Sequence, residues 1–125
     1  DVVMELTAGN VAVGTVEGIW QLETILSGET ASSVPAEVKT PTLEVNRGRV
    51  SVYTGCNRGD ATIEVTEESI AFGPLRLTRM ACSESAMQVE AAIAAALDGS
   101  APYTVTADRL TIGDDRAGLV WRRHP

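Results

Sequence analysis

Short segments of alternating apolar and polar residues recur along most of this chain, and they restrict its fold more than any other feature. In the first clear example, Trp20, Leu22 and Leu26 fall on one face and Gln21 and Glu23 on the other, as in a half-buried strand. Further strands of this kind are expected at 42–45, 49–53, 61–65, 70–72, 103–106, 109–112 and 119–122. Such alternation is typical of antiparallel sheet with one buried face.

Turn residues connect these strands into hairpins. Asn46-Arg47-Gly48 joins the strands at 42–45 and 49–53, and Glu67-Glu68-Ser69 joins those at 61–65 and 70–72. Gly73-Pro74 then ends the second hairpin. The stretch 27–40 is rich in Ser, Thr, Glu and Pro without periodicity, so we expect a loop there.

One helix is expected at about 84–97. Ser83 or Ser85 can cap its start, and Ser85 followed by Gln88 has the spacing of a capping box. Gly99 and Pro102 favour its end. Apolar residues recur on one face at helical spacing: Ala86, Val89, Ile93, Ala96 and Leu97. About eight short strands with one late helix predict an α+β fold, either a mostly antiparallel, strongly curved sheet or a small barrel.

Length and charge limit the organisation and the partners. A chain of 125 residues has the size of one domain, expected at 16–125, with 1–15 as an N-terminal arm or the remnant of a preceding domain. The net charge of −7 argues against binding to nucleic acid or anionic lipid. The longest apolar run, 91–97, is too short for a transmembrane segment. We expect a monomer.

The only two cysteines are Cys56 and Cys82. A disulfide between them is the favoured interpretation, with two buried thiols or one reactive thiol as alternatives. Two thiols cannot complete a four-ligand zinc site, and we expect no bound metal. A disulfide would place the protein in an oxidising compartment.

A short motif surrounds each cysteine. The first is Thr54-Gly55-Cys56-Asn57-Arg58, and the second is Thr78-Arg79-Met80-Ala81-Cys82. Together with Phe72-Gly73-Pro74-Leu75, Ala86-Met87 and Glu90, they resemble the META domain, the family of the HslJ-like heat-shock protein of bacterial envelopes. The resemblance runs from Gly18-Ile19-Trp20-Gln21-Leu22 through Pro41-Thr42-Leu43 to Leu119-Val120-Trp121, and so covers most of the chain.

The resemblance implies a compact fold of antiparallel strands around one helix, in a secreted or membrane-anchored protein without an established catalytic activity or cofactor. Relatives with two such domains in tandem would account for residues 1–15. Relatives often carry an aromatic residue and a glycine after Gly-Cys-Asn. Here the segment reads Arg58-Gly59-Asp60-Ala61, so a partner that meets an aromatic residue in relatives would find none.

Arg58 and Arg79 are candidates for anion or partner recognition, because guanidinium groups bind carboxylates and similar anions in bidentate geometry. Residues 47–82 carry five arginines against four acidic residues, a balance of +1, while the rest of the chain carries −8. Internal salt bridges or solvated arginines are the alternative. Gly55 suits a tight backbone path, and Asn57 can satisfy backbone groups nearby.

Other conspicuous residues are interpreted as structural. Trp20 and Trp121 are expected to anchor the core rather than form an aromatic binding face, and Met80 and Met87 to pack against the helix. Asp114-Asp115 lacks the ligand spacing and final Glu of a calcium-binding EF-hand loop.

No catalytic set emerges from the sequence. The only histidine, His124, lies near the C-terminal end, and neither a nucleophile elbow nor a phosphate-binding loop is present. We therefore expect a non-enzymatic module without a cofactor, located in the cell envelope, with or without a lipid anchor, or secreted. It would bind an unknown protein or envelope component or aid stress tolerance. The alternatives are a thiol-based redox protein or enzyme using Cys56 or Cys82, and a protease inhibitor presenting the 27–40 loop.

Overall fold

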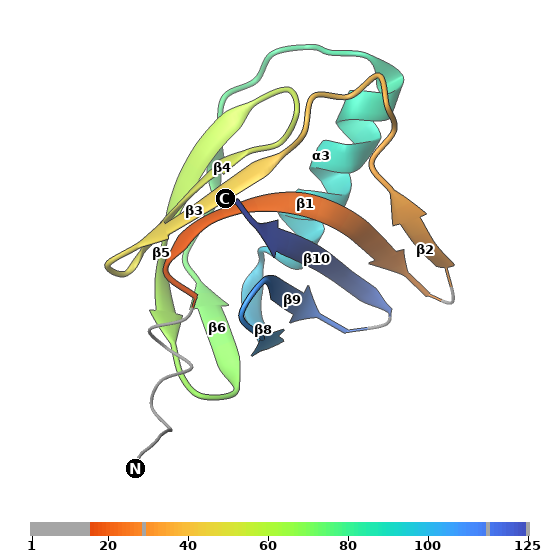
Figure 1. The fold of residues 1–125 in the computed structure, drawn as a ribbon. Coiled ribbons are helices and arrows are strands. Elements are labelled where there is room, and N and C mark those ends of the chain that lie inside the picture. The colour runs from red at the N-terminus through yellow and green to blue at the C-terminus, as the bar shows by residue number, and fades with distance from the viewer. Residues whose placement is uncertain (1–15, 29, 115, 125) are drawn as a thin grey trace.

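The residues that the structure describes fold into a closed antiparallel β-barrel with one helix packed against it (Figure 1). The computed structural model describes residues 16–28, 30–114 and 116–124. Its strands are β1 (Gly18–Ser27), β2 (Thr30–Ser33), β3 (Thr42–Asn46), β4 (Arg49–Tyr53), β5 (Arg58–Val65), β6 (Ser69–Phe72), β7 (Arg76–Leu77), β8 (Gly99–Val105), β9 (Arg109–Gly113) and β10 (Ala117–Arg123). The expected α+β architecture is confirmed, in its barrel form. The arm predicted at 1–15 lies outside the described residues.

Pairing of the first and last long strands closes the barrel. The order around it is β10-β9-β8-β6-β5-β4-β3-β1, and β1 pairs again with β10. Closure removes the exposed edges that an open sheet of these strands would leave. Two short strands lie outside this ring, because β2 pairs with β1 and β7 pairs with β5.

A bulge in β1 corrects one expectation about its inward face. The register with β10 shifts between Leu22 and Thr24, so the alternation of side chains reverses there. Trp20 and Leu22 are buried as predicted, but Ile25, not Leu26, packs against the core after the bulge. A strict period of two cannot continue through an inserted residue.

The hairpin of β3 and β4 forms as its sequence predicts. Asn46 pairs with Arg49, and Arg47 and Gly48 occupy the turn with φ of 51° and 79°. Positive φ at both central residues is the geometry that best matches the twist of two-residue hairpins. The inward side chains of this hairpin are Leu43, Val45, Val50 and Val52.

Several strands differ from the sequence expectation; β8 begins at Gly99 instead of 103, because Gly99–Pro102 pair with β6. The segment 27–40, expected to be a loop throughout, contains β2, whose polar residues Thr30–Ser33 are all exposed. Backbone pairing with β1 alone holds this strand, so it has no apolar pattern to predict it. In addition, β5 begins at Arg58 instead of 61, and β7 was not expected.

The helix α3 spans Glu84–Ala96 and agrees with the prediction at 84–97. Ser83, not Ser85, caps it, because the Ser83 hydroxyl accepts a hydrogen bond from the Ala86 N–H at 3.2 Å. Ser85 instead donates to the Glu37 carboxylate at 3.0 Å. The capping box proposed for Ser85 is therefore wrong. Within the described residues, no helix is long and apolar enough to cross a membrane.

One continuous hydrophobic core fills the barrel and extends beneath α3. Trp20 and Trp121 are both 0% exposed, which confirms their role as core anchors. The Trp20 indole N–H donates to the Val16 carbonyl at 3.0 Å. The buried face of α3 consists of Ala86, Val89, Ile93 and Ala96. It packs against the buried side chains of the strands.

Candidate functional site

The Thr54–Asn57 turn between β4 and β5 is closed by the Thr54 side chain. The Thr54 hydroxyl oxygen accepts hydrogen bonds from the N–H groups of Asn57 at 2.9 Å and Cys56 at 3.3 Å. Gly55 has a φ of +94°, and a Cβ there would lie 2.9 Å from the Lys39 carbonyl oxygen. The turn therefore needs glycine for both its conformation and the close approach of the 38–41 segment.

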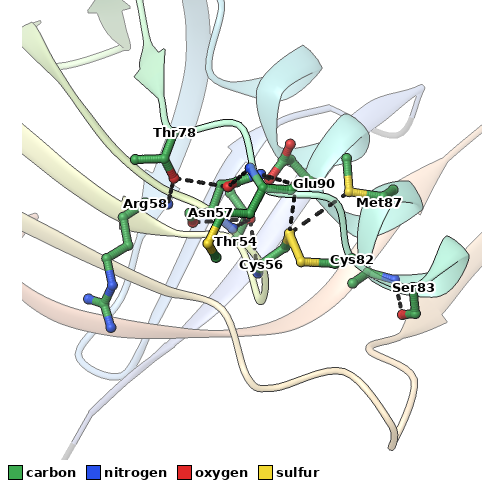
Figure 2. The surroundings of a disulfide bond; sticks show 11 residues. Thr54, Cys56, Asn57, Arg58, Thr78, Cys82, Ser83, Met87 and Glu90 are labelled. Atoms are coloured by element: carbon green, nitrogen blue, oxygen red, sulfur yellow. Dashed lines mark hydrogen bonds between the residues drawn. A yellow bond between two sulfur atoms is a disulfide. The ribbon is translucent and has the colours of Figure 1, made fainter.

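The Asn57 side chain connects this turn to the second motif. It is 1% exposed, and its Oδ1 accepts from the Met80 N–H at 2.7 Å and from the Thr78 hydroxyl at 2.9 Å. Its Nδ2 donates to the Glu90 carboxylate at 2.9 Å and to the Met80 carbonyl at 3.2 Å (Figure 2). All the hydrogen-bonding capacity of this amide is thus used inside the protein. The expectation that Asn57 satisfies backbone groups is confirmed, although those groups lie 23 residues away in sequence.

Glu90 brings the helix into the same network. Its Oε1 accepts from the Thr54 hydroxyl at 2.8 Å as well as from Asn57, so one carboxylate oxygen receives two donors. We call Thr54, Asn57, Thr78, Met80 and Glu90 the motif network. It joins the β4–β5 turn, the 78–82 segment and α3 through hydrogen bonds that share partners. Hydrogen bonds connected in this way strengthen one another.

The disulfide joins the same segments by a covalent bond. Cys56 and Cys82 are bridged, with their Cα atoms 6.0 Å apart, so the favoured interpretation of the two cysteines is confirmed. Cys56 is 5% exposed, and its sulfur lies 3.4 Å from the Met80 carbonyl oxygen and 3.9 Å from the Met87 sulfur. A disulfide sulfur carries no proton, so both are packing contacts. The motif residues therefore form a structural clamp around the bridge.

A hollow of about 440 Å³ opens beside this clamp. Met80 and Met87 line it and are 58% and 37% exposed, so they are not buried by packing against the helix as the sequence predicts. Met87 lies one position beyond the buried Ala86, and this places its side chain on the flank of the helix, in line with Glu90 three residues on. The other lining residues are Asn57, Leu75, Leu77, Thr78, Arg79, Ala81 and Glu90.

The two arginines singled out from the sequence line neighbouring hollows. Arg79 lines the hollow of Met80 and Met87, whereas Arg58 lines a second hollow of about 420 Å³ on the outer face of β5. The Arg58 guanidinium carbon lies 4.9 Å from the centre of the Tyr53 ring. Neither arginine forms an ion pair with another described residue.

The remaining candidates from the sequence have local roles where the structure describes them. Asp114 closes the β9–β10 turn, and hydrogen bonds from the N–H groups of Arg116 and Ala117 lower the pKa of its carboxyl group. Asp115 lies outside the described residues. Across the described ranges, no cluster of three or more His, Cys, Asp or Glu side chains forms a metal site.

Comparison with known proteins agrees with the motifs. The family model described as META domain matches residues 13–124. An NMR structure of a protein from Burkholderia xenovorans is similar, with a TM-score of 0.69 and 25% identity over 99% of this chain and 97% of that chain. Another NMR structure has a TM-score of 0.68 and 20% identity over 86% of this chain and 89% of the other, and shares the fold. No curated protein matches significantly.

Proposed function

The chain belongs to the META domain family, and from this premise we propose that it is a non-enzymatic module that binds a macromolecular partner outside the cytoplasm. Binding at the envelope or in the secreted space is the route by which it would aid stress tolerance. The disulfide supports this location, because such bonds persist in oxidising compartments.

The exposed methionines beside the disulfide carry the proposal. Met80, Met87 and Ile19 are the large hydrophobic side chains exposed among the described residues, and the two methionines line the same hollow. Methionine is flexible and polarisable, so it suits surfaces that adapt to a partner. Apolar side chains grouped at a hollow are typical of interaction sites, whereas single exposed ones are ordinary.

The motif network supports a binding role because its polar groups bond to one another and leave the side chains of the hollow available to a partner. The polar groups of Thr54 and Asn57 are buried and engaged with one another, with Thr78 and with Glu90. Their hydrogen bonds hold the clamp together, and a partner can reach the thioethers, Arg79 and the leucines of the hollow, with Thr78, Ala81 and the half-buried Glu90 beside them. A redox role for Cys56 or Cys82 would first require reduction of the bridge.

Quantitative capture of partners from envelope and secreted fractions tests this proposal. The full chain is immobilised as wild type, as the double variant M80Q/M87Q, and as the control I19Q, which removes an exposed apolar side chain elsewhere. We expect a saturable partner whose capture falls about thirtyfold in M80Q/M87Q, since two methionines buried by the partner contribute on the order of 1 kcal/mol each. The I19Q control should capture it like wild type. Equal capture by all three proteins, or no partner above background, would contradict the proposal.

A further inference from the structure

Three hollows adjoin one another around β7 through shared lining residues, and we call them together the trough. The hollow of Met80 and Met87 shares Leu77 and Thr78 with the second hollow, on the outer face of β5. This second hollow shares Asp60 and Arg76 with a third, of about 220 Å³, which is also lined by Arg49. On one side of β7 the exposed thioethers of Met80 and Met87 lie beside Arg79 and Glu90, and on the other side the lining is rich in arginine.

The pairing of β4, β5 and β7 places three arginines on the basic side of the trough. Tyr53 pairs with Arg58, and Asp60 pairs with both Ser51 and Arg76. Asp60 is the one described carboxylate that lines the second and third hollows, and it lies 3.3 Å from the Arg49 guanidinium; Glu90 lines the first hollow, where its carboxylate accepts from Thr54 and Asn57. Arg58 and Arg76 have no ion-pair partner among the described residues. The whole chain has a net charge of −7, but the three arginines against Asp60 give the basic side of the trough a local excess of positive charge.

The outer edge of β7 offers backbone groups beside these arginines. The Thr78 N–H donates to the Arg58 carbonyl at 2.9 Å, and Leu77 lies opposite Gly59 at the next position. In an antiparallel pair, the residue next to a hydrogen-bonded position directs its own N–H and C=O away from the partner strand. The N–H and C=O of Leu77 thus point to the free edge, since β5 is the only described strand that pairs with β7.

We propose that this trough binds an extended acidic segment of a partner protein, with its carboxylates on Arg58 and Arg76 and an apolar side chain between Met80 and Met87. This inference rests on the proposed function and names the chemistry of the partner. Guanidinium groups bind carboxylates through charge-assisted hydrogen bonds. A peptide also has the backbone groups to pair with Leu77 and apolar side chains for the methionine hollow.

Other polyanions fit this surface less well. A nucleic acid or a long acidic glycan would bring dense negative charge close to a protein that is itself strongly acidic outside this strip. An acidic glycan would also leave the thioethers of Met80 and Met87 uncovered. A peptide segment with a few carboxylates matches the three arginines locally and extends only along the trough.

Fluorescence anisotropy with defined probes tests the inference on the full chain. The probe is a labelled synthetic peptide in which Glu residues flank a central Leu. The comparison probes are the same peptide with Gln replacing Glu and an oligogalacturonate. We expect the Glu peptide to bind, with an affinity that falls as salt is raised, and both comparison probes to bind at least about tenfold more weakly.

Charge reversals locate the binding surface. R58E/R76E should weaken binding of the Glu peptide by about tenfold or more, because it replaces two guanidinium donors by carboxylates that repel the peptide. The control R116E/R122E makes the same change of net charge at β10 and the turn before it, on the opposite side of the barrel, and should change affinity less than about twofold. The neutral pair R58Q/R76Q should give an intermediate loss.

The possible outcomes separate this inference from the proposed function. If M80Q/M87Q loses the captured partner but R58E/R76E binds the peptide like wild type, the acidic-segment inference is wrong and the proposed function stands. No binding of the Glu peptide, or tighter binding of the oligogalacturonate, also overturns the inference. If neither double variant changes partner capture or peptide binding, both proposals are wrong.

Discussion

Replacing Asn57 by Asp is the sharpest perturbation of the motif network, because it preserves the shape of the side chain and turns the donor Nδ2 into an acceptor oxygen. The new carboxylate oxygen would stand where Nδ2 now donates, 2.9 Å from the Glu90 carboxylate and 3.2 Å from the Met80 carbonyl. Two hydrogen bonds are lost at about 1 kcal/mol each. Two like charges whose centres lie about 4 Å apart repel by about 4 kcal/mol in a partly buried setting, of which about 2 should remain after the side chains move apart.

We therefore expect N57D to lower the free energy of unfolding by about 4 kcal/mol at neutral pH. Denaturant unfolding followed by tryptophan fluorescence measures this directly, since Trp20 and Trp121 are fully buried in the native state. The deficit should shrink as the pH is lowered from about 7 towards about 4, because protonation restores a donor at this position.

The matched control for this experiment is the double variant N57D/E90Q. Glutamine supplies an N–H donor to the new carboxylate and removes the like charge, so it should recover about 2 kcal/mol of the loss. Destabilisation of N57D by less than about 1 kcal/mol, or no recovery in N57D/E90Q, would refute the view that these contacts hold the clamp together.

Three further perturbations test the fold around the site. Replacing both Cys56 and Cys82 by Ala should cost about 3.5 kcal/mol of stability in the chain-entropy model, measured by denaturant unfolding; a cost near zero would contradict a stabilising bridge. Gly59→Ala should displace β7, because a Cβ there would overlap the Arg76 carbonyl oxygen, and faster amide exchange at 76–78 would report it. Burial, and secondarily Glu67, raise the pKa of Tyr103 above its ordinary value, so stability should fall as the pH rises through that raised pKa. Denaturant unfolding measured across the alkaline pH range would check this prediction. The Tyr103→Phe variant is the control and should not show the fall in stability.

Local signals in the sequence predict much of the barrel. The β3–β4 turn follows from Asn46-Arg47-Gly48, and the helix from a capping serine followed by apolar residues at helical spacing. Each of these elements is specified by neighbours in the chain. By contrast, β2 has no apolar residue other than Ala31 and forms by backbone pairing with β1. No local sequence pattern predicts this pairing.

The site was harder to predict, because its contacts are long-range. The partners of Asn57 lie 21 to 33 residues away, so the sequence could indicate a polar turn but not a clamp. Arg58 was paired with Arg79 in the sequence interpretation because each lies near a cysteine. Strand pairing places Arg58 near Arg49 and Arg76 on the outer face of β4, β5 and β7, and Arg79 lines the neighbouring hollow of the same trough. The exposure of Met87 could have been found from its position beside the buried face of the helix.

The measurement that most directly tests the account is a backbone amide NMR titration of the full chain with the Glu-containing peptide. The account predicts saturable shifts concentrated at β7, the 78–80 segment and Arg58, with β9 and β10 on the opposite side of the barrel unchanged. The buried part of the clamp, Thr54 and Cys56, should keep its native signals throughout, because it supports the surface without contacting the peptide. Shifts centred on β2 or β8, or no shifts at all, would contradict the central claim that this protein binds its partner along β7.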